Sequence, residues 1–371
     1  MKKPLPLLRG EHGQLSTFPL HNCTSNLDCS LNGACTSEGH CRCDAPWRGQ
    51  ACGTIGYNAT TPAIAKDIWP ISDTAHNTWG GPIVGPDPNG TFHAFIPLYR
   101  NGSLWGASVA KHGVATAVAG PFSWSTLPDI KTGINPAFLS FRNASGSYHT
   151  IWDESFGVKI ATSLDGPFLK VGGFALPSPK QPNPAPIYHD NAFFLVTQHT
   201  KSVWTTPSLA PGAVWTLHGN ISQGNTTLPT NVHVEDPFMW IDKRNNWHII
   251  NHAYDTTQHA QCGTSTVSAH FFSVDGKEWH LIGGLEPYGH TVSFDDGTTH
   301  TYSTLERPNI FFEGGVMTHL VVAVDLDVGD EGCANRTSGW CKREAKRPCC
   351  CNCCKFDDHT GTLVIALNVR N

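Results

Sequence analysis

Residues 236–240 read Asp-Pro-Phe-Met-Trp, and after a polar turn residues 247–250 read Trp-His-Ile-Ile. A Pro opens the first apolar run, and an aromatic residue followed by a His begins the second. Two short apolar runs separated by a turn are typical of paired antiparallel strands. This unit recurs along the chain, so its structure sets the architecture of the whole domain.

The same unit occurs five times. Its opening dipeptides are Gly81-Pro82, Asn135-Pro136, Asn183-Pro184, Asp236-Pro237 and Arg307-Pro308. Turn signals such as Asp165-Gly166 and Asp275-Gly276 follow the paired runs and predict further strands in each repeat. A Gly, Asp and Thr-rich loop over 286–301 lengthens the last interval. Repeats of three or four antiparallel strands arranged radially form a β-propeller. We therefore expect an all-β protein with a five-bladed β-propeller over residues 54–371.

The C-terminal part of this domain combines a strand with a cysteine-rich insertion. Residues 361–368 predict a strand that either completes the last blade or pairs with the N-terminal part of the domain. Seven cysteines lie in the insertion, about residues 333–354, and Cys262 makes eight. Two interpretations stay open for them, a disulfide-pinned loop or a thiolate metal cluster over 349–354. An oxidising compartment favours the disulfides, and we expect no metal.

The composition indicates a secreted glycoprotein. The chain has 14 cysteines and a net charge of −5, and its sequons are Asn22, Asn58, Asn89, Asn101, Asn143, Asn220, Asn225 and Asn335. The start, Met1–Leu8, is basic but lacks the apolar stretch of a signal peptide, so we expect that signal to be missing or truncated. No basic run indicates nucleic-acid binding, and no apolar run reaches the ~20 residues of a membrane span.

Six of the cysteines lie between residues 23 and 52, in a segment too small to build a core, so bridges must hold it together. Spacing alone leaves fifteen pairings open for six cysteines. The stretch 41–52, Cys-Arg-Cys-Asp-Ala-Pro-Trp-Arg-Gly-Gln-Ala-Cys, resembles the second half of an EGF-like module. The resemblance covers residues 19–53 and implies the pairs Cys23–Cys35, Cys29–Cys41 and Cys43–Cys52. It also implies a surface for contact with an extracellular protein. The acidic residues that precede the first Cys in calcium-binding modules are absent, so we expect no calcium there.

The innermost strands of a propeller surround a central funnel, so the five openings are expected to converge. The repeats, with Glu235-Asp236-Pro237 in the fourth and Glu306-Arg307-Pro308 in the fifth, resemble the propellers of glycoside hydrolase families 43 and 32. The resemblance implies that Glu235 is the general acid, and like-charge repulsion from Asp236 would raise its pKa. Family 43 enzymes carry an Asp at the openings of blades one and three, where this chain has Gly81 and Asn183.

Other residues are candidates for the same funnel. Glu306 is a candidate second carboxylate, with Arg307 orienting a substrate hydroxyl or carboxylate, although the two also suit a structural ion pair. We expect substrate contacts from Trp79, Asn135, Asp153, Asn183, His252 and Arg307. The aromatic ring of Trp79 suits either a sugar platform or the core between blades.

Two functions stay open. One is a glycoside hydrolase that acts on an extracellular polysaccharide, and the other is a non-catalytic glycan-binding or adhesion protein on the same scaffold. A purely structural matrix component is a weaker third interpretation. No cofactor is expected for any of them.

Overall fold

The computed structural model describes residues 22–57, 76–100, 109–126, 130, 135–153, 157–176, 183–198, 200–221, 224–225, 232–255, 267–282, 286–294, 297–302, 305–325 and 360–369. Several predictions fall outside these residues. They concern the start of the chain, Cys262, the insertion over 333–354, and the sequons at Asn58, Asn101 and Asn335.

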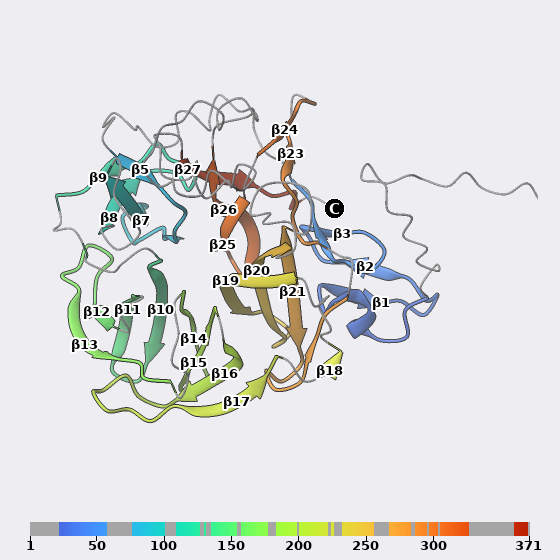
Figure 1. Cartoon of the computed structure of the whole chain (residues 1–371), viewed down its shortest axis with the longest axis horizontal. Coiled ribbons are helices and arrows are strands. Elements are labelled where there is room, and N and C mark those ends of the chain that lie inside the picture. Colours follow the sequence, from blue (N-terminus) through green and yellow to red (C-terminus); the bar gives the residue numbers. More distant parts are fainter. Residues whose placement is uncertain are drawn as a thin grey trace, which may run out of the picture.

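The repeats fold into a five-bladed β-propeller, as predicted, and Figure 1 shows its sheets arranged around a common axis. Blade 1 contains β5 (His76–Thr78), β6 (Ile83–Val84), β7 (Phe92–Arg100), β8 (Val109–Ala115) and β9 (Ser123–Trp124). Blade 2 contains β10 (Ala137–Asn143), β11 (Gly146–Trp152), β12 (Gly157–Ala161) and β13 (Leu169–Gly173). Blade 3 contains β14 (Ala185–His189), β15 (Ala192–Thr197), β16 (Thr200–Thr206) and β17 (Thr216–Asn220).

Blade 4 contains β18 (Gly224–Asn225), β19 (Val232–Ile241), β20 (Trp247–Asp255), β21 (Ser268–Ser273) and β22 (Trp279–His280). Blade 5 contains β25 (Leu305–Glu313), β26 (Val316–Asp325) and β27 (Thr360–Ala366). The insertion over 286–301, expected as a loop, instead forms a hairpin of β23 (Thr291–Ser293) and β24 (Thr299–Thr301). The difference has a local reason, because β-branched Thr and Val residues flank the turn at Gly297, whose φ of 82° suits a tight reversal.

The strand β27 closes the ring. It pairs with β26 along its whole length and so completes blade 5. It also reaches blade 1, because Thr362 Oγ1 lies 3.1 Å from Thr78 Oγ1 and accepts a hydrogen bond from the Gly80 backbone N–H at 3.1 Å. Thr362 of β27 therefore connects the last blade to the first.

The openings of blades 4 and 5 share one distortion. Glu235 pairs with His252 and Phe238 with Ile250, so two residues of β19 lie opposite one residue of β20. The strand β25 has the same bulge between Glu306 and Asn309. Each bulge places a residue before a Pro in the left-handed region, with φ 50° for Asp236 and 53° for Arg307. Bulges of this kind re-aim side chains, and non-Gly residues at such φ values collect at functional sites.

Buried histidines form hydrogen-bonded pairs in two of the blades. His93 Nδ1 lies 2.8 Å from His112 Nε2 in blade 1, and His248 Nδ1 lies 3.0 Å from His270 Nε2 in blade 4. The rings of each pair are nearly parallel, with interplanar angles of 15° and 7°. A turn Asp faces the outer nitrogen of each second-strand His, Asp87 at 3.5 Å in blade 1 and Asp242 at 3.6 Å in blade 4. The recurring histidines thus have a shared role in packing.

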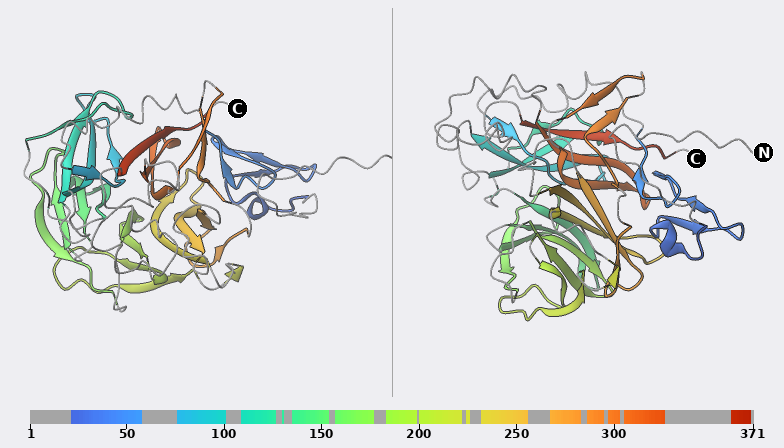
Figure 2. Two further views of the ribbon diagram at one scale, coloured as in Figure 1. Left: turned by 45° about the horizontal axis from the view of Figure 1, so that its top comes forward. Right: turned by 45° about the vertical axis from the view of Figure 1, so that its right-hand side comes forward.

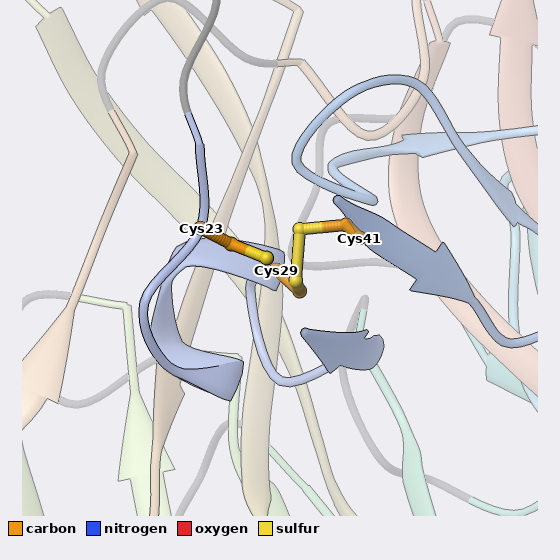
Figure 3. Close-up of side chains that lie close together, drawn as sticks. All are labelled: Cys23, Cys29 and Cys41. Atoms are coloured by element: carbon orange, nitrogen blue, oxygen red, sulfur yellow. A yellow bond between two sulfur atoms is a disulfide. The ribbon is translucent and has the colours of Figure 1, made fainter. Parts of the chain in front are cut away.

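The N-terminal module is a small disulfide-bonded unit. It contains the short helix η1 (Asn26–Cys29) and the strands β1 (Gly33–Cys35), β2 (Cys41–Cys43), β3 (Trp47–Arg48) and β4 (Thr54–Ile55). The three predicted pairs are present, Cys23–Cys35, Cys29–Cys41 and Cys43–Cys52. Figure 3 shows the Cys29–Cys41 bridge with Cys23 beside it.

The module packs against blade 4, and both views in Figure 2 show it beside the propeller. The ring of Trp47 stacks on His270, with 5.0 Å between ring centroids. Arg244 from the β19–β20 turn lies 2.5 Å from Asp44 Oδ2 and donates to the Leu31 carbonyl oxygen at 2.5 Å. In the described part of the chain, no helix has the length and hydrophobicity of a membrane span.

Candidate functional site

The five strand openings converge on one cavity, which is lined by residues from all five blades. Its wall contains a Pro from each of blades 2 to 5, and the phenyl rings of Phe138 and Phe238. Its polar lining comes from Asn135, Asn183, Asp236, Arg307 and Asn309. Residues more than 200 positions apart in the chain therefore meet at this cavity because each one begins an innermost strand.

A chain of side-chain amides runs around the cavity toward the carboxylates of blade 4. Asn135 Nδ2 donates to Asn183 Oδ1, and Asn183 Nδ2 donates to Asp236 Oδ1. Asn183 Nδ2 also lies 2.5 Å from Gln198 Oε1, and Gln198 Nε2 donates to Glu235 Oε2 at 2.6 Å. The amide of Gln198 thus links blade 3 to Glu235.

Sequence reasoning missed Gln198, although a signal for it exists. It directly follows β15, the second strand of blade 3, just as Asp153 directly follows β11 in blade 2. In each blade, the end of the second strand lies beside the start of the first strand, because the two strands are antiparallel. The residue that follows a second strand is therefore a candidate for the site.

Glu235 is held between two hydrogen-bond donors, and it is not one of the described residues that line the cavity. Its side chain is 14% exposed, and its Oε1 lies 3.2 Å from Nδ1 of the buried His252. Burial alone would lower the pKa of His252, but the carboxylates of Glu306 and Glu235 raise it above its ordinary value. His252 and the Gln198 amide thus orient the two carboxylate oxygens of Glu235.

The surroundings of Asp236 raise the pKa of its carboxyl group. Burial raises its pKa to about 7, Arg307 opposes the rise, and the neighbouring Glu235 reinforces it. The guanidinium Nε of Arg307 lies 3.9 Å from Asp236 Oδ2. Asp236 lines the cavity, so its carboxyl group can contact a ligand there.

Three acidic side chains and one histidine gather next to the opening of blade 4. Carboxylate oxygens of Glu235, Asp236 and Glu306 and a ring nitrogen of His252 all lie within 4.8 Å of one another. Inverting glycosidases hold their two carboxyl groups ~6.5–9.5 Å apart and retaining ones ~5–5.5 Å apart. Carboxylates and an imidazole also suit a divalent cation, but His252 and Arg307 already provide positive charge beside these three acids.

The opening of blade 1 has no room for a carboxylate. A Cβ added to Gly81 would lie 2.5 Å from the carbonyl oxygen of Phe95, closer than side-chain carbons approach in folded proteins. The backbone of β7 thus explains why this position carries a Gly, and it leaves Asp236 as the one carboxylate among the described residues that line the cavity.

The remaining predicted site residues lie outside the cavity lining. Asp153 is buried, accepts from the Gly157 backbone N–H at 2.8 Å and pairs with Lys159 at 3.0 Å. Trp79 is only 2% exposed, and Arg307 lies 5.9 Å above its ring. Glu306 is 1% exposed and acts through its charge on His252.

Two polar atoms near the cavity have no protein partner within the described part of the chain. They are Asn135 Oδ1, in the cavity wall, and Asn251 Oδ1, on a side chain whose Nδ2 donates to the Glu235 carbonyl oxygen at 3.4 Å. A buried polar atom without a partner is rare in folded proteins. The Asn135 oxygen is therefore suited to accept a hydrogen bond from a ligand.

No protein-family model and no curated protein matches the sequence. The chain is similar to solved propellers. One is the GH43 BlXynB protein from Bacillus licheniformis, with 15% identity and a TM-score of 0.40 over 57% of this chain and 44% of that one. This chain thus spans less than half the length of that protein.

Two others match over most of their own length. The endo-arabinase from Bacteroides thetaiotaomicron has 8% identity and a TM-score of 0.43 over 80% of this chain and 96% of that chain. A putative exo-beta-1,3-galactanase from Bifidobacterium bifidum has 10% identity and a TM-score of 0.40 over 73% and 87%. At these identities the likeness concerns the fold alone.

Proposed function

We propose that this protein binds the end of a glycan chain in the cavity at the strand openings. The observation that carries the proposal is the lining itself, a ring of amides, one carboxylate and one guanidinium set among proline and phenyl surfaces. Sugar hydroxyls both donate and accept hydrogen bonds, which matches amides and charged groups, and the C–H faces of sugars match apolar rings.

Recognition without cleavage is the function that this geometry supports best. Hydrolysis needs two carboxyl groups at a defined separation around the glycosidic bond. Here Gly81 and Asn183 occupy the openings of blades 1 and 3, and Asp236 is the one carboxylate of the described cavity lining. The protein is thus proposed as a glycan-binding or adhesion protein.

Hydrolysis is the second candidate, and the family resemblance would make Glu235 its general acid. The observation that favours it is the placement of Glu235 beside the cavity with oriented donors on both oxygens. Under this proposal Asp236, whose pKa is raised to about 7, is the group that carries a proton near neutral pH. The roles of the two neighbours would then be the reverse of those that the family resemblance implies.

A polysaccharide panel tests both candidates. We expect binding by calorimetry without release of reducing ends, and we expect Asn183→Ala to weaken binding about tenfold through loss of hydrogen bonds to the amide chain. The matched control is Asn191→Ala, on the exposed β14–β15 turn of the same blade. Release of reducing ends that is abolished by Glu235→Gln would establish hydrolysis instead. The absence of binding to every glycan in the panel would contradict both candidates.

The location proposed for the protein is extracellular. Support comes from three disulfides and from sequon residues Asn22, Asn89 and Asn143, which are all exposed. Mass spectrometry of the protein secreted from a eukaryotic host would show glycans at these positions. An EGF-like identity of the module and its contact with another extracellular protein remain predictions.

A further inference from the structure

The histidine pair of blade 4 reaches the surface on which the N-terminal module docks. At one end, His248 Nε2 lies 3.6 Å from Asp242 Oδ2, and His248 Nδ1 lies 3.0 Å from His270 Nε2. At the other end, His270 Nδ1 lies 3.5 Å from Nδ2 of Asn32, which belongs to the module. The ring of Trp47 covers the same histidine. A line of polar groups thus connects a turn of the propeller to the module.

The hydrogen atoms along this line can be assigned from their partners. Asn32 Nδ2 donates to the Cys52 carbonyl oxygen at 3.0 Å, so the amide is oriented with its N–H groups toward Cys52 and His270. His270 Nδ1 must therefore accept, and the proton of His270 lies on Nε2, which donates to His248 Nδ1. The proton of His248 then lies on Nε2 and faces the carboxylate of Asp242.

An added proton reverses the contact with the module. Both nitrogens of His248 are engaged as described, so the proton enters at the lone pair of His270 Nδ1. The charge then stays on His270, or His270 passes its Nε2 proton to His248, whose imidazolium faces Asp242. In both cases His270 Nδ1 carries a hydrogen and faces the N–H group of Asn32. A buried hydrogen bond is replaced by two donors that face each other, which destabilises the contact.

The pair in blade 1 does not have this conflict. His112 Nδ1 lies 2.8 Å from the hydroxyl oxygen of Ser125, and a hydroxyl can rotate from donor to acceptor. Proton uptake by His93 and His112 therefore leaves that contact in place. Blade 4 differs because its pair ends on an amide N–H group that cannot accept.

We propose that protonation of the His248–His270 pair controls the docking of the N-terminal module, which binds blade 4 when the pair is neutral and separates from it in acid. The proposal is independent of the proposed glycan-binding function. Burial and the neighbouring His248 hold the pKa of His270 well below its ordinary value of 6.5 in the docked form. Separation exposes the ring to water and lets its pKa return toward 6.5. Docking is therefore complete above pH 6.5 and weakens below it, by about tenfold per pH unit for one proton.

The other charged groups near the pair titrate in different ranges. Asp242, Arg244 and Asp44 act on His248, and Lys243 lies beside Asp242 in the same turn. Free carboxyl groups titrate at about pH 4, and Lys and Arg above about pH 10. Within the described residues, His248 is the group whose charge acts on His270. A measurement between pH 7 and pH 5 thus reports on the two histidines.

Hydrogen exchange of the full chain measures the separation of the module. The Ile55 N–H group donates to the Pro287 carbonyl oxygen at 2.8 Å, across the boundary between module and propeller. Ile55 also pairs with Trp47, so the two residues leave the propeller together. Mass spectrometry at pH 7, 6 and 5, corrected for the intrinsic exchange rate, gives the opening constant of this amide. The amides of β15 in blade 3 report on opening of the ring itself.

We expect the opening constant of Ile55 to rise about tenfold between pH 6 and pH 5 in the wild type. The matched control, His112→Phe, removes the pair in blade 1 and should show the same rise. His270→Phe keeps an aromatic ring against Trp47 but takes up no proton, and Asn32→Ser replaces the amide with a hydroxyl that can donate or accept. Each of these two variants should limit the rise to about threefold or less.

Three results would overturn the proposal. They are a wild-type opening constant that does not change with pH, a rise in Asn32→Ser equal to that of the wild type, and an equal rise at the β15 amides, which would show that acid opens the whole ring. Circular dichroism shows whether each variant is folded. If His270→Phe is not folded, Asn32→Ser decides the question, because it leaves both histidines in place.

Discussion

Glu235 and His252 face each other across β19 and β20, with 3.2 Å between the carboxylate Oε1 and the imidazole Nδ1. Because His252 is buried and lies beside a second carboxylate, Glu306, it provides positive charge in the middle of an acidic cluster. The contact thus fixes the orientation of Glu235 next to Asp236, which lines the cavity.

Replacing His252 is expected to destabilise the fold. In His252→Leu, Glu235 and Glu306 lose their shared counter-charge in a buried place, and breaking such a pair costs about 3–5 kcal/mol. Urea unfolding followed by circular dichroism measures the change. The control is His40→Leu, at an exposed position of the module. A loss below about 1 kcal/mol, the size of an exposed ion pair, would contradict the role of His252 as a counter-charge.

Asp236→Asn is expected to flatten the dependence of stability on pH. A carboxyl whose pKa rises from 3.8 to about 7 on folding contributes stability that is complete below 3.8 and is lost as the pH rises through about 7. The free energy of unfolding of the wild type should therefore fall relative to Asp236→Asn between pH 4 and pH 8. Asp165→Asn, at a side chain that is 64% exposed, should leave the profile unchanged. A parallel profile for Asp236→Asn would refute the raised pKa.

For His112 we expect the opposite dependence of stability on pH, with stability lost as the pH falls. Burial lowers the pKa of His112 to about 4. Its contribution to stability is present above the ordinary value of 6.5 and is lost as the pH falls through about 4. His112→Gln, which cannot take up a proton, should lose less stability than the wild type between pH 7 and pH 4. Equal losses in the two proteins would show that His112 does not drive the acid response.

The contact between the module and the propeller can be measured with a double-mutant cycle. Arg244 and Asp44 are partly exposed, at 31% and 41%, and lie 2.5 Å apart. Partly exposed pairs of this kind contribute about 1 kcal/mol or less. We expect a coupling energy of about 0.5–1 kcal/mol between Arg244→Gln and Asp44→Asn in thermal unfolding. Strict additivity of the two changes would show that this ion pair does not stabilise the docked module.

Much of the fold was predictable because its signals are local and repeated. The apolar runs after each opening Pro and the Asp-Gly turns predict strands and hairpins without long-range information. The three disulfides followed from the resemblance of residues 41–52 to a known module. The hairpin over 291–301 was not predicted, because its Thr-rich segments lack the alternation of apolar and polar residues that indicates a strand.

The site was only partly predictable for a different reason. The openings are visible in the sequence, but burial is a property of the assembled ring. Trp79 and Glu306 lie at strand openings, as Asn183 does. Packing against neighbouring blades buries both side chains, so neither lines the cavity. Gln198 belongs to the site because it donates a hydrogen bond to Glu235 of the neighbouring blade. No short sequence motif indicates such a contact.

The completion of blade 5 by β27 constrains how the protein is made. During synthesis on the ribosome, β25 and β26 emerge before residues 360–366, so blade 5 lacks β27 until this segment has been made. Nascent chains stalled before Thr360 would expose the edge of β26 to chaperones and to neighbouring chains.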